Sequence, residues 1–311
     1  MTSISSRVEQ ARAACAEYRA GGTDLQQRLR SGVSSGPVVD LHGLSELKGI
    51  AWDQQGRARI GALTPIAALA SDARLFAAYP ALARSAAGLA TPQIRSMATL
   101  GGNLLQRSRC WYFRNPAVPC FKKGGEDCPA RNGNHLFGAC FDLGGCVAPH
   151  PSTLGMALLA CEAHFETADG SVRPLAALYG DGSDARHDHQ LEERQLLSAV
   201  LMPVPVPGER TAYCRAISRA AAEWPLAEAV VRLTTSAGNI AFARVAVGGV
   251  APVPLRRERV EQAMVGRPAN HDTLRSAAVH AADGAMPLPM TGYKPGLLRA
   301  TVLEALEHAL Q

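Results

Sequence analysis

Four cysteines in one stretch of the chain give it the clearest potential for redox chemistry: Cys110, Cys120, Cys128 and Cys146. They follow a glycine-rich segment, ATLGGN, at 98–103. Thiolates bind zinc and iron–sulfur clusters, and glycine turns let backbone N–H groups approach phosphates. Two such centres on one chain predict an electron-transfer protein rather than a hydrolase or a simple binding module.

The cysteine spacing, C-x9-C-x7-C-x17-C, leaves the kind of centre open. Zinc ligands usually come in close C-x2-4-C pairs, and this stretch has none. Wide, irregular spacing is compatible with a loop around a cubane cluster, and the Gly, Pro, Lys and Asn residues between the cysteines indicate an exposed loop. An iron–sulfur cluster, a zinc ion and unpaired thiols remain as alternatives, and spacing alone leaves Cys140 as a fifth candidate ligand.

A second glycine pair lies near the N-terminus, in the stretch AGGTDL. A strand–turn–helix with two glycines can hold a pyrophosphate, although an ordinary tight turn is the commoner explanation of one such pair. The stretch matches neither the Rossmann pattern nor the P-loop. Two glycine turns about 80 residues apart suit a diphosphate held between two subdomains. The candidate residues are Ala20, Gly21, Gly22, Thr23, Asp24 and Leu25 in the first turn and Thr99, Gly101, Gly102 and Asn103 in the second.

Hydrophobic periodicity and turn residues predict the elements that position these turns. Ser6 and Glu9 form a predicted capping box, and Asp169-Gly170 is the expected turn of a hairpin at 163–172. The segment 180–195 is polar, and we interpret its His and Asp residues as a solvated loop. We expect helices at 6–17, 75–89, 151–163, 225–236, 272–283 and 295–310, and strands near 18–20, 37–41, 57–63, 211–218 and 241–250.

Composition excludes several classes of protein. The net charge of +5 is spread over the chain without a basic block, which argues against nucleic-acid binding. No apolar run approaches the roughly 18 residues that a membrane span needs. We interpret Cys15, Cys161 and Cys214 as buried small apolar residues, and we do not expect disulfides in a chain of this length without a secretory signal.

Several segments together resemble the FAD-binding medium subunit of the molybdenum hydroxylases, the xanthine dehydrogenase family. They are AGGTDL at 20–25, QIRSMATLGGNLLQRSRCWYFR at 93–114, CVAPHPS at 146–152, VAVGGVAPVPLR at 245–256 and GYKPGLLRATVLEAL at 292–306. The chain is most similar to the periplasmic-type aldehyde oxidoreductase branch, whose FAD subunit carries a 4Fe-4S cluster in a loop. The resemblance covers nearly the whole chain.

The resemblance implies roles for individual residues. The two glycine turns would hold the FAD pyrophosphate, Leu197 would contact the flavin ring, and Arg215 stands where the family often has a Lys near the cofactor. The cluster ligands would be the four cysteines of the opening paragraph, whereas Cys140 matches none. Thr153 replaces an Asp that usually helps to hold FAD. His150, at the entry of the expected helix, is either a polar helix-entry residue or a neighbour of the cluster or cofactor.

The implied fold is α+β, with a two-subdomain FAD-binding domain at 1–205 that includes a Cys-rich loop at 106–149. A domain of a small antiparallel sheet with helices follows at 206–311, after a linker marked by Pro203, Pro205 and Pro207. The implied function is electron transfer between partner subunits and an external acceptor. The partners would be a large subunit and a small subunit. The large subunit would hold the molybdenum cofactor and oxidise the substrate, for which the resemblance implies aldehydes. The small subunit would carry 2Fe-2S clusters.

Alternatives are a stand-alone flavin oxidoreductase with structural zinc in the loop, the FAD subunit of an enzyme like 4-hydroxybenzoyl-CoA reductase, and a non-enzymatic scaffold. We expect a soluble protein, cytoplasmic, or periplasmic if it is exported with a signal-bearing partner.

Overall fold

The computed structural model describes residues 3–219 and 222–311 of the chain. Three sheets are present in this part, with the strand orders β1-β2, β3-β4-β7-β5-β6 and β11-β10-β9-β8. The strands are β1 Glu17–Arg19, β2 Val38–Asp40, β3 Ile50–Trp52, β4 Ala58–Gly61, β5 His164–Thr167, β6 Val172–Pro174, β7 Leu197–Leu201, β8 Arg210–Ala216, β9 Ala227–Ser236, β10 Asn239–Gly248 and β11 Leu255–Arg256.

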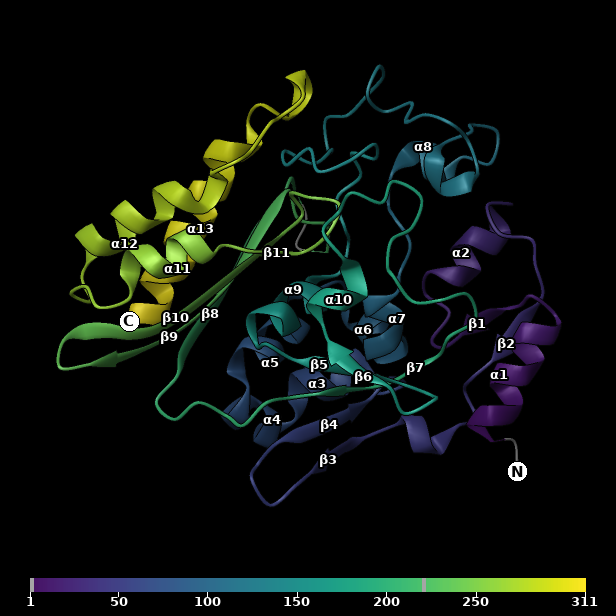
Figure 1. The fold of residues 1–311 in the computed structure, drawn as a ribbon, viewed down its shortest axis with the longest axis horizontal. Helices are drawn as coiled ribbons and strands as arrows, with labels where there is room; N and C mark the ends of the chain where they lie inside the picture. Colours follow the sequence, from purple (N-terminus) through teal and green to yellow (C-terminus); the bar gives the residue numbers. More distant parts are fainter. Residues whose placement is uncertain (1–2, 220–221) are drawn as a thin grey trace.

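Helices surround these sheets (Figure 1). The α-helices are α1 Ile4–Ala13, α2 Leu25–Arg30, α3 Ile66–Ser71, α4 Ala73–Ala78, α5 Pro80–Gly88, α6 Pro92–Met97, α7 Leu100–Leu104, α8 Trp111–Arg114, α9 Thr153–Ala160, α10 Ala176–Tyr179, α11 Glu258–Met264, α12 His271–Ala278 and α13 Lys294–Leu310. Short 3-10 turns lie at Ser45–Leu47, Phe121–Lys123, Val279–Ala282 and Pro289–Thr291.

The N-terminal segment pairs β1 and β2 in parallel, with α1 beside them (Figure 1). The predicted capping box is wrong. Ser3, not Ser6, caps α1, because its hydroxyl accepts a hydrogen bond from the Ser6 N–H, and the helix ends at Ala13. The chain then turns through Cys15, whose φ is +48°, and this cysteine is exposed rather than buried as expected.

The five-stranded sheet is antiparallel throughout, and helices α3, α5 and α9 contribute to its core. The helix expected at 75–89 is in fact two helices. Pro80 lacks the N–H that a continuous helix would need, so it begins α5 instead. The predicted hairpin is confirmed, with Gly170 at φ +84° in the turn between β5 and β6.

The C-terminal sheet corrects another prediction, because the segment expected as a helix at 225–236 is strand β9. Val230, Val231, Thr234 and Thr235 are β-branched and favour extended structure. Strand β9 lies between β8 and β10 and pairs antiparallel with both. It is an inner strand of this four-stranded sheet, so it forms hydrogen bonds along both of its edges.

Alternate residues of β9 pack into two different cores, as the period of a strand requires. Val230 joins the core that includes α5 and α9, whereas Val231 joins the core that includes α13. The C-terminal sheet therefore lies between the helices of the first domain and its own helices, as Figure 1 shows for α11, α12 and α13. The α+β prediction is confirmed. In the described residues no helix is both long and apolar enough to cross a membrane.

Candidate functional site

The two glycine turns lie against each other. Their separation in the sequence does not by itself require this contact. A Cβ on Gly21 would lie 1.8 Å from the backbone oxygen of Met97, directly before the second turn. Gly22 has φ +71°, in the left-handed region that favours glycine. Gly101 packs so tightly that a Cβ would lie 2.9 Å from that of Ala62. The glycines therefore bring two distant backbone segments into contact.

A hollow of about 120 Å³ lies between these turns. Its lining includes all the predicted cofactor residues except Asn103 and Arg215: Ala20, Gly21, Gly22, Thr23, Asp24, Leu25, Thr99, Gly101, Gly102 and Leu197. Asn103 is buried beside it and accepts a hydrogen bond from the Ser152 hydroxyl at 2.8 Å. Arg215 lies elsewhere, where it donates to the carbonyl oxygens of Gly88 and Glu223.

The first turn offers free hydrogen-bond donors to this hollow. Among the described residues, the N–H groups of residues 21–24 donate no backbone hydrogen bond. Successive free N–H groups in a turn form a concave site for an anion. Gly102 also faces open space, because a Cβ there would approach only the Thr99 hydroxyl, at 3.0 Å. The hollow thus has the donors and the room that a pyrophosphate needs.

Arginines make the surroundings of the hollow positive. Arg28, Arg109 and Arg114 all pair with Asp24, at 3.3, 3.2 and 2.6 Å. Burial alone would raise the pKa of Asp24, but Arg109 and Arg114 outweigh it, so the carboxyl pKa lies below its ordinary value. Burial lowers the pKa of Arg109 to about 10, so it still carries its charge at neutral pH. Glu17 also pairs with Arg28, which leaves three cations facing two carboxylates.

The Cys-rich loop brings its four thiols toward one another. Cys110 precedes α8, and the charges of Cys120 and Cys128 both act on it. Cys128 and Cys146 lie close enough for each thiol to act on the titration of the other. This contact lowers the pKa of Cys128 to about 6 and raises that of Cys146, so the pair holds one proton tightly and gives up the other readily.

Backbone N–H groups also face these sulfurs. Those of Val147 and Ala130 lower the pKa of the Cys128 thiol, and N–H groups near sulfur stabilise thiolate ligands, while the Arg131 N–H donates to the Cys128 carbonyl oxygen at 3.0 Å. Cys120, Cys128 and Cys146 are buried, whereas the sequence suggested a fully exposed loop. Cys140 is buried in the core of the C-terminal sheet, where the charges that act on it belong to Lys294 and Arg257. It does not face the other loop thiols.

The polar segment at 180–195 packs onto the Cys-rich loop through Asp188. We had expected this residue to lie in a solvated loop. Asp188 is buried and pairs with Arg107 at 2.6 Å and with Lys122 at 2.8 Å. The His187 side chain stays exposed and pairs with Asp184, while its carbonyl oxygen accepts a hydrogen bond from Lys122 at 2.7 Å. Asp188 thus ties together Arg107, at the start of the Cys-rich loop, and Lys122, about 15 residues further along it. This buried contact helps to position a segment with little secondary structure.

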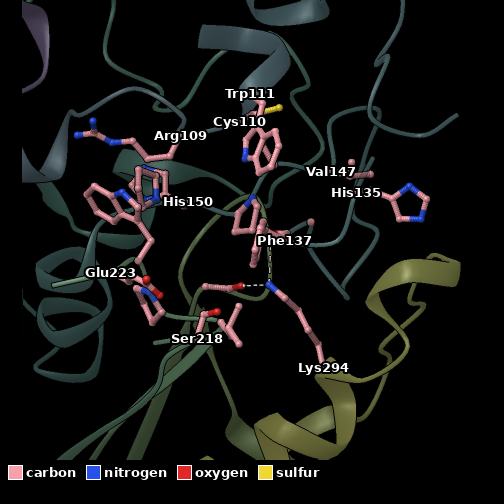
Figure 2. A pocket seen from close by; sticks show the side chains of 18 of the residues that line it. Arg109, Cys110, Trp111, His135, Phe137, Val147, His150, Ser218, Glu223 and Lys294 are labelled. Carbon is pink, nitrogen blue, oxygen red and sulfur yellow. Dashed lines mark hydrogen bonds between the residues drawn. The ribbon is translucent and has the colours of Figure 1, made fainter. Parts of the chain in front are cut away.

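A second cavity, of about 720 Å³, lies between the Cys-rich loop and the C-terminal sheet and was not foreseen from the sequence (Figure 2). His150 is buried at its wall, with its ring centroid 4.5 Å from that of Tyr179 in an edge-on arrangement and with no partner for Nε2 among the described residues. Burial lowers the pKa of His150 to about 4, so the ring is neutral at pH 7. Arg109 borders the cavity with its guanidinium over the Trp224 ring, 4.5 Å from the centroid.

Thr153 lies beside the same cavity but is itself engaged with protein. Its hydroxyl donates to Glu228 at 2.9 Å, and Tyr213 donates to the same carboxylate at 2.9 Å. Burial raises the pKa of Glu228. Position 153 thus has a hydroxyl where the resemblance leads one to expect a carboxyl group. The carboxyl group of Glu228, on β9, lies directly beside it.

Comparisons with known proteins agree with this architecture. The model for the FAD binding domain in molybdopterin dehydrogenase matches residues 3–205, and the CO dehydrogenase flavoprotein C-terminal domain matches residues 212–309. The chain therefore belongs to the FAD-binding subunits of the xanthine dehydrogenase and CO dehydrogenase family. It is an oxidoreductase subunit of the molybdenum hydroxylases, in which catalysis takes place on partner subunits.

Two curated relatives illustrate this membership. The aldehyde oxidoreductase FAD-binding subunit PaoB of Escherichia coli (strain K12) is 33% identical over 272 residues, which are 85% of this chain and 84% of the relative. The carbon monoxide dehydrogenase medium chain of Afipia carboxidovorans is 27% identical over 79% of this chain and 71% of its own.

Solved structures share the fold. The cyanide-inactivated Cu,Mo-CO dehydrogenase aligns with a TM-score of 0.77 at 23% identity, covering 100% of this chain and 96% of the other. Quinoline 2-oxidoreductase from Pseudomonas putida 86 aligns with a TM-score of 0.78 at 19% identity, covering 100% and 95%.

Proposed function

We propose that this chain is the FAD- and 4Fe-4S-carrying electron-transfer subunit of a molybdenum-dependent hydroxylase that oxidises aldehydes. The observation that carries the proposal is the meeting of two glycine turns, rich in free N–H donors, beside a loop of converging thiols. The similarity to an aldehyde oxidoreductase FAD-binding subunit, at 33% identity, supports the substrate class.

The residues around the small hollow fit the pyrophosphate of FAD. The N–H groups of residues 21–24 would donate to its oxygens, and Arg28 and Arg109 would offset its charge. Gly102 would leave room for the close approach, and Leu197 supplies an apolar wall. Bound FAD exchanges electrons one or two at a time, while the protein orients it and tunes its potential.

The four thiols fit a 4Fe-4S cluster in ligand type and number. Cys110, Cys120, Cys128 and Cys146 would be the ligands, with backbone N–H groups donating to their sulfurs. The low pKa of Cys128 favours the thiolate that coordination requires. Cys140 stays outside the set, because it belongs to the other core.

The electron donor would lie on other chains. The substrate would be oxidised on a large subunit that holds the molybdenum cofactor, and a small subunit with 2Fe-2S clusters would connect it to this chain. An external acceptor would then receive the electrons. The chain would work in the compartment of these partners, the cytoplasm or, after joint export, the periplasm.

The test compares the chain alone with the chain co-expressed with candidate molybdopterin and 2Fe-2S subunits from the same organism. Aldehyde-dependent reduction of an artificial dye is measured for both preparations. We expect turnover only from the assembled complex, since aldehyde oxidation would take place at the molybdenum cofactor of the large subunit. Robust turnover by the chain alone would refute the proposal. A complex that does not oxidise aldehydes but oxidises another class of substrate would also refute it.

A further inference from the structure

A thiol, a carboxylate and an imidazole meet on the C-terminal domain, away from the Cys-rich loop. Cys214 lies on β8, and Glu304 and His308 lie on α13. One ligand atom from each of these three residues lies within 4.8 Å of the other two. The Cys214 sulfur and the His308 Nδ1 are 3.4 Å apart. Neither the cofactor site nor the loop uses any of these groups.

The fold holds these three side chains together through rigid elements. Glu304 and His308 are four residues apart on a long helix, so they share one face of it. Cys214 points from β8 into the core that the C-terminal sheet shares with α13. Arg210, at the start of β8, donates to the Leu310 carbonyl oxygen at 2.6 Å, which fixes the end of the helix against the strand.

We propose that Cys214, Glu304 and His308 form a binding site for a zinc ion. Zinc lies about 2.3 Å from sulfur and about 2.0 Å from imidazole nitrogen, so tetrahedral coordination separates these atoms by roughly 3.5 Å. The observed separation of 3.4 Å requires almost no movement. Thiolate and imidazole ligands prefer zinc to magnesium or calcium, and the exposed position of Glu304 and His308 leaves a fourth ligand position to water.

Binding would join β8 to the last helix of the chain. Coordination would replace the proton of the Cys214 thiol, and that proton would pass to solvent. Without a metal the sulfur and the imidazole are already in contact, so two of the three ligands are in place before the ion arrives.

The experiment uses the purified protein with its cofactors and zinc as the probe. Zinc affinity and stoichiometry are measured by equilibrium dialysis with elemental analysis, and the first coordination shell by X-ray absorption at the zinc edge. His308→Ala removes one ligand from an exposed position. The matched control is His271→Ala, which removes an exposed imidazole of the same domain that pairs with Glu307 instead.

We expect one zinc per chain, with one sulfur and otherwise nitrogen or oxygen in its shell. His308→Ala should weaken binding on the order of 100-fold, since even outer-shell changes cost 10–100-fold, and His271→Ala should bind as wild type does. Cys214→Ser should remove the sulfur from the shell. Absence of stoichiometric zinc, a shell of four sulfurs, or equal affinity in wild type and His308→Ala would overturn the proposal.

Discussion

Asp24 and Arg114 form an ion pair of 2.6 Å that joins the first glycine turn to the Cys-rich loop. Both side chains are largely buried, and Arg114 belongs to α8, which begins directly after Cys110. One carboxylate thus links the proposed phosphate site to the proposed cluster site. A change at either residue is therefore expected to affect both.

Asp24→Asn should lower the free energy of unfolding by roughly 2 kcal/mol at pH 7, because it removes a charge-assisted hydrogen bond. The folded-state pKa of Asp24 is depressed, so the carboxylate stabilises the fold above about pH 4 and loses this effect as the pH falls through the folded value. Denaturant unfolding at several pH values measures both. Equal free energies of unfolding in Asp24→Asn and wild type at every pH would contradict the stabilising role of the Asp24 carboxylate.

Gly102→Ala should give a folded protein that is poor in flavin. The added Cβ contacts only the Thr99 hydroxyl within the protein, but it enters the space assigned to the pyrophosphate. Gly296→Ala, at a helical glycine with open space around it, is the matched control and should keep its flavin. Flavin released on denaturation is quantified for both. Full flavin occupancy in Gly102→Ala would count against the site.

Cys128→Ser should lose or destabilise the cluster, while Cys140→Ser should retain the iron. The first sulfur faces Cys146 and several N–H groups, whereas the second lies in an apolar core. Iron and acid-labile sulfide per chain are the measurements. Equal iron loss in the two variants would show that the ligand set is assigned incorrectly.

His150→Gln should flatten the pH dependence of stability below neutrality. The folded-state pKa of His150 is about 4, so protonation of the unfolded chain begins first as the pH falls below about 6.5. Wild type should therefore lose about 2 kcal/mol between pH 7.5 and pH 5 from this residue alone, and nothing above pH 7.5. Identical slopes in wild type and variant would refute a buried neutral imidazole.

Local sequence signals predicted much of the fold, and their failures have physical causes. The Asp169-Gly170 turn acts locally, and the hairpin around it was predicted correctly. Strand β9 was missed although local signals were present. Its β-branched residues and the two-residue turn Ala237-Gly238 into β10 both favour a hairpin. The division of one expected helix at Pro80 was available from the sequence, since proline interrupts a helix.

The candidate site was only partly accessible from the sequence. The glycine turns were visible as pairs of glycines, but their contact at Gly21 and Met97 depends on the fold. Asp188 looked like part of a solvated loop, because nothing local indicates that Arg107 and Lys122 approach it from more than 60 residues away. The large cavity at His150 arises between elements from three parts of the chain, so no single segment could predict it.

Cofactor analysis of the purified chain tests the central claim most directly. Released flavin, iron, sulfide and zinc are quantified on one preparation, together with its absorbance spectrum. The proposal predicts one FAD with about four irons and about four sulfides per chain. Flavin without iron, with zinc bound by the loop thiols, or a folded protein that holds no flavin at all, would contradict it.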